Sequence, residues 1–194
     1  MNNSNINAQL SLPMFVDFDF KSTASARTHY GNAAESIVCE ALELAPISID
    51  GRCTTNFDAL SQQGTYWEIK SVRQGGSVPL YQMRIDKERE FMRNEGKLMY
   101  AFCVHTVKNA KSNYDLWRQL SYGVKIIVAQ PNIVHSLAHT GILRKIKSDK
   151  GAGYTRKGYD QGYYNVAIKY LNQEQRPGFV VTINGFKIPV SIAY

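Results

Sequence analysis

The first clear pattern along the chain is helical and begins near Arg27. Between Ala34 and Ala45, apolar residues recur at intervals of three and four, the spacing of one face of an α-helix, and Pro46 is the expected stop. Residues 1–26 are rich in Asn and Ser and lack this spacing. The pattern therefore predicts an N-terminal arm, 1–26, followed by a single domain, 27–194, that opens with a long helix.

Short β-like runs follow this helix. They are rich in β-branched and aromatic residues, are separated by turn-forming residues, and comprise 47–50, 55–60 and 65–72. They predict a three-strand meander. Residues 78–85 also alternate and are expected to extend the same sheet, whereas Asp86 is expected to cap a charged helix over 87–94 that ends before Gly96.

The rest of the chain continues to mix helices and strands. Apolar strands are expected at 98–105 and 124–129, and helices at 113–120 and from Pro131 to His139. Two β-like segments flank Asn184-Gly185 within 178–194, a strong hairpin signal. The predicted fold class is α/β, with a central mixed sheet flanked by helices and a C-terminal β-hairpin extension.

Composition adds a preference for an anionic partner. The 194 residues include 23 Lys and Arg against 16 Asp and Glu, a net charge of +7 that favours nucleic acid most simply. Three cysteines without a C-x-x-C pair argue against a zinc or redox centre and fit a reducing, cytoplasmic compartment. The chain contains no stretch of about 18 apolar residues, so a membrane partner is not expected.

One segment concentrates this positive charge. Residues 144–170 mix Lys and Arg with Gly and Tyr, which favours DNA contacts because the cations neutralise phosphates and tyrosine packs on sugars or bases. A solvated loop is the alternative. The candidate DNA contacts there are Arg144, Lys145, Lys147, Lys150, Tyr154, Arg156, Lys157 and Tyr159, and within the core they are Arg73 and Arg84.

Candidate chemistry lies in the third β-like run. A period of two places Glu68 and Lys70 on one face of a strand, where burying an ion pair costs several kcal/mol per ion. The bare triplet is weak evidence, because Glu95-Gly96-Lys97 has the same pattern at a helix end. Only Glu68 has suitable surroundings, since Asp58 is expected opposite it on the neighbouring strand and Glu35 lies in the preceding helix.

These residues resemble the PD-(D/E)XK nuclease superfamily, which includes many type II restriction endonucleases and the archaeal-type Holliday junction resolvases. The resemblance covers 27–105, from the helix with its internal acid, Glu35, through Asp58 and Glu68-Ile69-Lys70 to the next helix and strand. Phe57 stands where the family often has Pro. A restriction-endonuclease-like core is therefore expected.

The resemblance also implies a metal-dependent reaction. Asp58, Glu68 and the backbone carbonyl of Ile69 are expected to hold Mg²⁺, for which Mn²⁺ can substitute, with Glu35 as a water-mediated or second-metal ligand. Lys70 is expected to orient the attacking water and stabilise charge on phosphorus, leaving a 5′-phosphate. Gln82 is a weaker candidate ligand.

The leading interpretation is a Mg²⁺-dependent DNA endonuclease of restriction type that cuts both strands as a homodimer. One alternative is a structure-specific nuclease, such as a junction resolvase or a phage recombination or repair nuclease. Another is a non-catalytic DNA-binding protein on a nuclease-like scaffold, and the simplest is a cross-strand ion-pair network without catalysis. His135 and His139 are expected to be one packed and one solvated imidazole.

Overall fold

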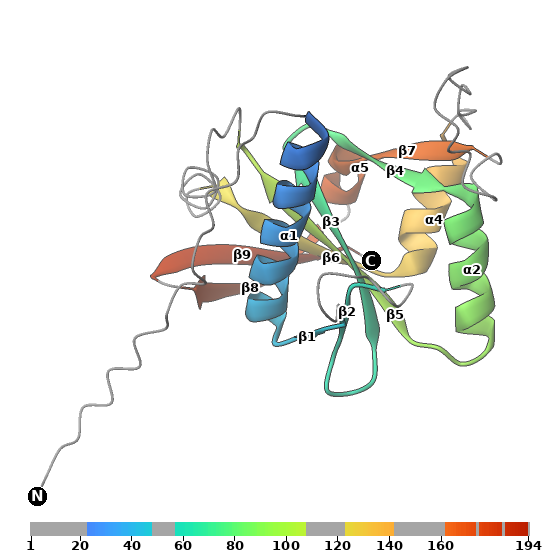
Figure 1. Ribbon diagram of the computed structural model, residues 1–194, viewed down its shortest axis with the longest axis horizontal. Helices are drawn as coiled ribbons and strands as arrows, with labels where there is room; N and C mark the ends of the chain where they lie inside the picture. The colour runs from blue at the N-terminus through green and yellow to red at the C-terminus, as the bar shows by residue number, and fades with distance from the viewer. Residues whose placement is uncertain are drawn as a thin grey trace, which may run out of the picture.

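The computed structural model describes residues 23–47, 57–107, 123–141, 162–173, 175–183 and 185–193 (Figure 1). The predicted helix at 113–120, most of the N-terminal arm and the candidate DNA contacts between Arg144 and Tyr159 lie outside these residues. The described part has the predicted α/β class, with a central mixed sheet flanked by helices.

Helix α1, Thr23–Leu42, packs its apolar stripe against the sheet, with Ala34 and Val38 fully buried. It begins earlier than predicted and therefore includes the end of the predicted arm. It also ends earlier, because Glu43 adopts a positive φ of 53° that breaks the helical path. Pro46, expected as the helix stop, instead belongs to the short strand β1, Ala45–Pro46.

Within the described residues, seven strands form the main sheet in the order β1-β2-β3-β5-β6-β9-β8. After β1 their bounds are Ala59–Leu60 for β2, Tyr66–Arg73 for β3, Leu98–His105 for β5, Lys125–Ala129 for β6, Gln175–Ile183 for β8 and Phe186–Ala193 for β9. β3 and β5 run parallel in register from Tyr66 opposite Leu98 to Arg73 opposite His105. The C-terminal hairpin is confirmed, and it extends this sheet through the pairing of β9 with β6.

Residues 78–85 do not extend the main sheet, so that prediction was wrong. Strand β4, Ser77–Tyr81, pairs instead with β7, Tyr163–Ala167, in a separate two-stranded sheet. A tight turn redirects the chain at Gly76, where an added Cβ would lie 2.8 Å from the carbonyl oxygen of Arg73. Two residues of the predicted basic loop, Val166 and Ile168, are buried in this region. The end of that loop is therefore β7 and the short helix α5, Ile168–Gln173.

Helix α2, Gln82–Arg93, starts five residues before the predicted charged helix. Two residues, Gln82 and Asp86, therefore have structural positions that differ from those predicted. Gln82 lies at the first helical position rather than on a strand, and Asp86 lies inside the helix rather than at its cap. Ile85 explains the difference, because its side chain is fully buried beneath the helix and joins the core. The predicted helix from Pro131 is confirmed as α4, Pro131–His139.

The core has two parts, one on each face of the main sheet. One part lies under α1 and includes Ile69, Ala101 and Cys103, whereas the other includes Tyr100 and Phe102 and packs against α2, α4 and α5. Adjacent residues of β3 and β5 therefore point to opposite layers. None of the helices in the described ranges is long and apolar enough to cross a membrane.

Candidate active site

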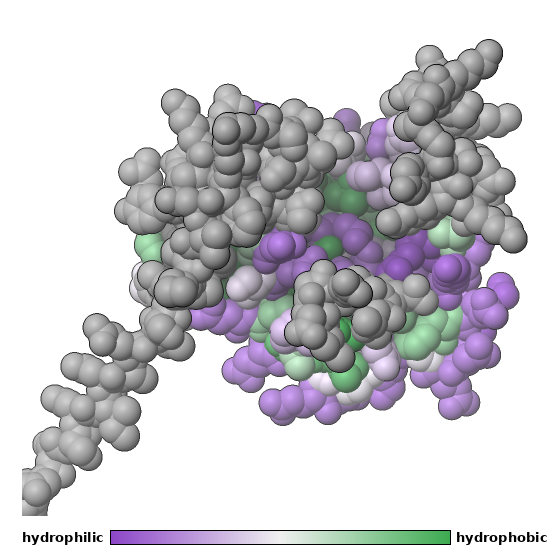
Figure 2. Space-filling model, viewed as in Figure 1, coloured by the Kyte–Doolittle hydropathy of each residue, from purple (hydrophilic) through white to green (hydrophobic). Residues whose placement is uncertain are grey.

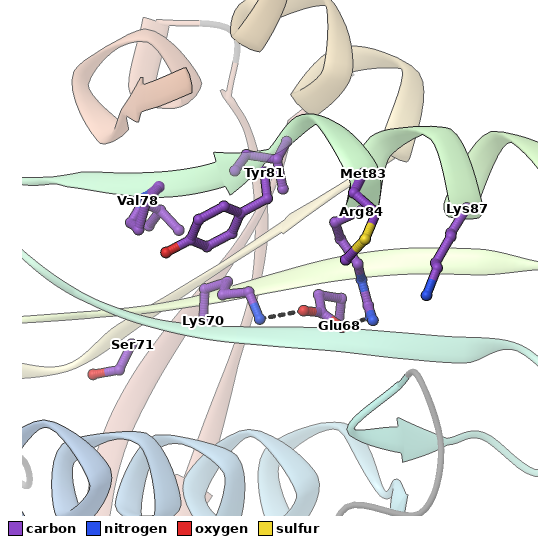
Figure 3. Close-up of a pocket in the computed structure, with 10 residues that line it drawn as sticks. Glu68, Lys70, Ser71, Val78, Tyr81, Met83, Arg84 and Lys87 are labelled. Atoms are coloured by element: carbon purple, nitrogen blue, oxygen red, sulfur yellow. Dashed lines mark hydrogen bonds and ion pairs between the residues drawn. The ribbon is translucent and has the colours of Figure 1, made fainter. Parts of the chain in front are cut away.

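Glu68 and Lys70 lie on the same face of β3, as the strand period predicts. Their side chains point toward β4 and α2, on the side of the sheet away from α1 (Figure 3). The Glu68 side chain is only 7% exposed and that of Lys70 is 28% exposed. The Lys70 ammonium pairs directly with Glu68 Oε1, so the two charges that the sequence placed together are in contact.

Asp58 lies directly before β2, where the two strands of the hairpin separate. Its backbone N–H donates to the carbonyl of Trp67 at 2.9 Å, and its Oδ2 accepts a hydrogen bond from the Ile69 N–H at 2.7 Å. The Asp58 carboxylate therefore continues the ladder beyond the end of β2. Because the N–H and C=O of one strand residue point to the same edge, the Ile69 carbonyl is also directed toward Asp58.

Both acidic residues face one ammonium. Lys70 Nζ lies 3.9 Å from Asp58 Oδ2 while it contacts Glu68 Oε1. Burial lowers the pKa of Lys70, but the negative charges of Glu68 and Asp58 outweigh it and hold that pKa above its ordinary value. Lys70 therefore stays charged between the two acids.

Glu35, from α1, is the third acidic residue in this electrostatic environment. Burial, helped by the negative charge of Asp58, raises the pKa of Glu35 to about 7, and the positive charge of Lys70 opposes the rise. Glu68 raises the same pKa by a smaller amount. Lys70 thus lies beside both Asp58 and Glu68, and Glu35 on α1 is coupled to these three residues electrostatically.

On the α2 side of Glu68 lies a network that the sequence analysis missed. Arg84 Nη2 pairs with Glu68 Oε2, and Arg84 Nε donates to Glu88 Oε1 at 2.7 Å. Glu88 is only 1% exposed and accepts a hydrogen bond from Tyr100 Oη at 2.5 Å. Its Oε2 also lies 2.8 Å from Nε2 of His135. The spacing of Arg84 and Glu88, four residues apart on one helix, is the only sequence signal for this network.

A cleft of about 450 Å³ opens beside the Glu68 and Lys70 pair. Residues 78–81 of β4 form its roof, and in Figure 3 the ring of Tyr81 hangs over Lys70. Ser71 and the exposed Lys87 also line it. In the view of Figure 2, hydrophilic residues gather over the middle of this face. The paired charges therefore border an open cleft.

Other predicted residues lie away from this cluster. The Gln82 amide donates to Asp86 at 2.8 Å, and Gln82 does not line the cleft. Arg73 is exposed at the end of β3. Glu95, the comparison residue in the second Glu-x-Lys triplet, is exposed after α2 with a positive φ of 64°. His135 is buried and His139 is exposed, as predicted.

The oxygen donors around Lys70 fit a hard divalent cation. The carboxylates of Asp58 and Glu68 both lie beside the Lys70 ammonium, and the Ile69 carbonyl is directed toward Asp58. Mg²⁺ commonly binds one or two carboxylates while keeping several waters. The pKa of Glu35 is raised mainly by burial, and the negative charges of Asp58 and Glu68 add to the rise. Within the described ranges, no three His, Cys, Asp or Glu residues form a ready-made metal cluster. An ion held by these oxygens would need further ligands, such as water, to complete its coordination.

Comparison with known proteins agrees with this geometry. A family model described as the PD-(D/E)XK nuclease superfamily domain matches residues 21–122. These residues include Asp58 and the elements α1, β3, α2 and β5. No curated protein and no solved structure gives a significant match. The matched residues make up more than half of the chain, and the chain belongs to the PD-(D/E)XK nuclease superfamily.

Proposed function

We propose that this protein is a Mg²⁺-dependent DNA endonuclease of restriction type, cutting both strands as a homodimer and leaving 5′-phosphates. The observation that carries the proposal is the position of the Lys70 ammonium, in contact with Glu68 and 3.9 Å from Asp58 beside an open cleft. A structural ion-pair network does not need a cleft beside it. A hydrolytic site does, because a phosphodiester must reach the charges.

The residues of the cluster have separate roles in this proposal. Asp58, Glu68 and the Ile69 carbonyl hold the ion, with Glu35 acting through a water or a second ion. A bound Mg²⁺ supplies Lewis-acid polarisation of a phosphoryl oxygen and lowers the pKa of a water. Lys70 orients the attacking water and donates to the charge that grows on the phosphoryl oxygens.

DNA binding is assigned to one cation at the cleft and to basic residues elsewhere in the chain. Lys87 lines the cleft and is exposed, so it can neutralise a phosphate close to the cluster. Arg73 and the basic segment from Arg144 to Tyr159 are the remaining candidates, on the basis of their charge and composition. The net charge of +7 supports the same assignment.

The test is cleavage of three substrates: supercoiled plasmid, a four-way junction and single-stranded DNA. We expect linear plasmid with Mg²⁺ or Mn²⁺, none with chelator, and loss of product in Asp58→Ala and Lys70→Ala. Glu95→Ala is the matched control and should cut normally, because Glu95 is exposed outside the cleft. Cleavage restricted to the junction would indicate a structure-specific nuclease, and DNA binding without any product would indicate a non-catalytic protein.

The dimer needs a separate measurement. A single site must act twice to cut a duplex, and two-fold symmetric DNA sites match two-fold proteins. We expect sedimentation of a dimer on a palindromic duplex in Ca²⁺ buffer. A monomer both with and without DNA would remove the homodimer from the proposal and leave the chemistry unaffected.

A further inference from the structure

Arg84 joins two carboxylates that have different environments. Its Nη2 pairs with Oε2 of Glu68, in the candidate site, and its Nε donates to Oε1 of Glu88, behind the site. The guanidinium carbon also lies 5.1 Å from the centre of the Phe57 ring. Arginine suits this position because its planar fork directs donors in fixed directions. The Arg84 guanidinium thus contacts Glu68, Glu88 and the Phe57 ring, although the Arg84 side chain is 21% exposed.

Glu88 is the anchor of this arrangement. It is 1% exposed, and a buried carboxylate is costly unless its oxygens are fully hydrogen-bonded. Here both are, because Oε1 accepts from Arg84 and Oε2 contacts Tyr100 and His135, which belong to β5 and α4. Burial alone raises the pKa of Glu88, but these contacts together hold it below its ordinary value.

The two cations divide the oxygens of Glu68 between them. Arg84 holds Oε2, and Oε1 faces Lys70, which is the side of Asp58. Both oxygens are therefore paired with a cation, and an ion that shares Glu68 with Asp58 would meet Oε1 beside Lys70, while Arg84 keeps Oε2 from chelating it. Figure 3 shows Arg84 and Lys70 reaching Glu68 from different directions.

We propose that Arg84, anchored by Glu88, is a positioning residue that restricts Glu68 to binding the ion through Oε1 alone. This inference rests on the proposed function, since it assigns Glu68 to the metal. It also gives Arg84 a role other than the DNA contact expected from its charge. Loss of Arg84 frees Oε2 and removes a nearby positive charge, and both changes strengthen ion binding while misplacing the ion for reaction.

The experiment measures ion affinity, DNA affinity and turnover separately. In Arg84→Met we expect Mn²⁺ to bind at least about threefold tighter by calorimetry, because a repelling charge is gone. Turnover at saturating Mn²⁺ should fall about 10²-fold, the scale of a misplacement of about 1 Å. DNA affinity in Ca²⁺ buffer should stay within about twofold. A merely structural role would not produce tighter ion binding together with slower turnover.

Two further variants keep the inference testable if Arg84→Met folds poorly. Arg84→Lys restores the charge but cannot bridge two carboxylates, so ion affinity should return toward that of the parent while turnover stays low. Glu88→Gln keeps the size and an acceptor oxygen, so it should change both quantities in the same directions by less. The double variant Arg84→Met with Glu88→Gln should match Arg84→Met alone, because Glu88 acts only through Arg84.

Several outcomes would overturn the inference. Weaker ion binding in Arg84→Met, or unchanged turnover, would show that Arg84 does not restrain Glu68. Weaker DNA binding with normal turnover at saturating DNA would assign Arg84 to the DNA instead. If the parent protein binds Mn²⁺ but cuts nothing, the proposed function fails. The Mn²⁺ affinity of Arg84→Met compared with the parent then still tests the role of Arg84. If the parent binds no ion, both fail together.

Discussion

The carboxylate of Asp58 serves as the strand partner of Ile69, whose N–H donates to Asp58 Oδ2 at 2.7 Å. One side chain therefore has a structural bond and a proposed metal bond. Asp58→Asn separates them, because an amide oxygen can still accept from Ile69 but binds Mg²⁺ poorly. We expect the free energy of unfolding of Asp58→Asn to stay within about 0.5 kcal/mol of the parent value. We expect its cleavage rate to fall by about 10²-fold or more.

Asp58→Ala is the matched comparison. It removes the acceptor as well as the charge, so a part-buried N–H loses its partner and stability should fall by about 1–2 kcal/mol. Urea unfolding of both variants with chelator present gives the two values. Equal destabilisation of Asn and Ala would mean that the hydrogen bond to Ile69 contributes nothing to the fold.

Glu35 makes stability depend on pH in a definite direction. Its pKa is about 7 in the folded protein against an ordinary 4.5. Between these values the unfolded chain has released a proton that the folded protein keeps, so stability is lost as pH rises toward 7. Glu35→Gln escapes this loss. In chelator we expect its free energy of unfolding, relative to the parent, to rise by on the order of 1 kcal/mol between pH 4.5 and 8, after allowance for solvent screening at this half-buried site.

Added Mg²⁺ provides the control for Glu35. A cation beside the carboxylate favours its ionised form, so Mg²⁺ at pH 8 should narrow the gap between Glu35→Gln and the parent. Glu95→Gln, at an exposed position, should track the parent at every pH. A constant difference between Glu35→Gln and the parent across this range would contradict a raised pKa at Glu35.

Phe57, the residue before Asp58, fills a packing role where other members of the superfamily often have Pro. Its ring is buried at 7% exposure and packs against Tyr66 and Phe91, with ring centroids 5.2 and 4.8 Å away. Phe57→Ala should cost about 3 kcal/mol or more, as for other buried aromatic truncations. Phe57→Leu keeps most of the volume and should cost about 1 kcal/mol. Thermal and urea unfolding compare the two, and equal costs would mean that the ring is not packed as described.

The sequence predicted those elements whose pattern is local. Residues 98–105 form a strand and residues 131–139 form a helix, both with the expected bounds. The signal for each lies within its own segment: a continuous apolar run for the strand and a proline at the start of the helix. The partner of β4 was not predictable in this way. Alternation indicates that Ser77–Tyr81 is a strand but does not specify its neighbour, and that neighbour, β7, lies in a Tyr-rich stretch that resembled a loop.

The candidate site divides along the same line. Glu68 and Lys70 share a face through the strand period alone, and the hairpin places Asp58 beside them. The burial of Glu88 was not predicted, because a charged residue in a charged helix is typical of a solvent-exposed surface. It is buried by Tyr100 and His135, which are 12 and 47 residues away in the sequence. Such contacts depend on how α2 and α4 pack on β5, which no spacing within the chain specifies.

The buried thiols give a chemical measure of the stability of the main sheet. Burial raises the pKa of Cys103 on β5 to about 12, and burial together with the charges of Glu35 and Asp58 raises that of Cys39 on α1 to about 11. At pH 8 almost no thiolate is present at either residue, and the thiolate is the form that reacts with alkylating reagents. Both cysteines are free.

We therefore expect Cys103 and Cys39 to be alkylated only when the domain unfolds. Peptide mapping by mass spectrometry after iodoacetamide treatment at pH 8 follows each thiol separately. The two rates should rise together with urea, with a denaturant dependence equal to that of global unfolding, because α1 and β5 share one core. The cavity-forming variant Phe57→Ala should accelerate both by the factor that its loss of stability predicts, whereas Glu95→Ala should not. Rapid alkylation of Cys39 alone in native buffer would mean that α1 detaches from the sheet independently, and the electrostatic coupling of Glu35 to Asp58 would then be intermittent.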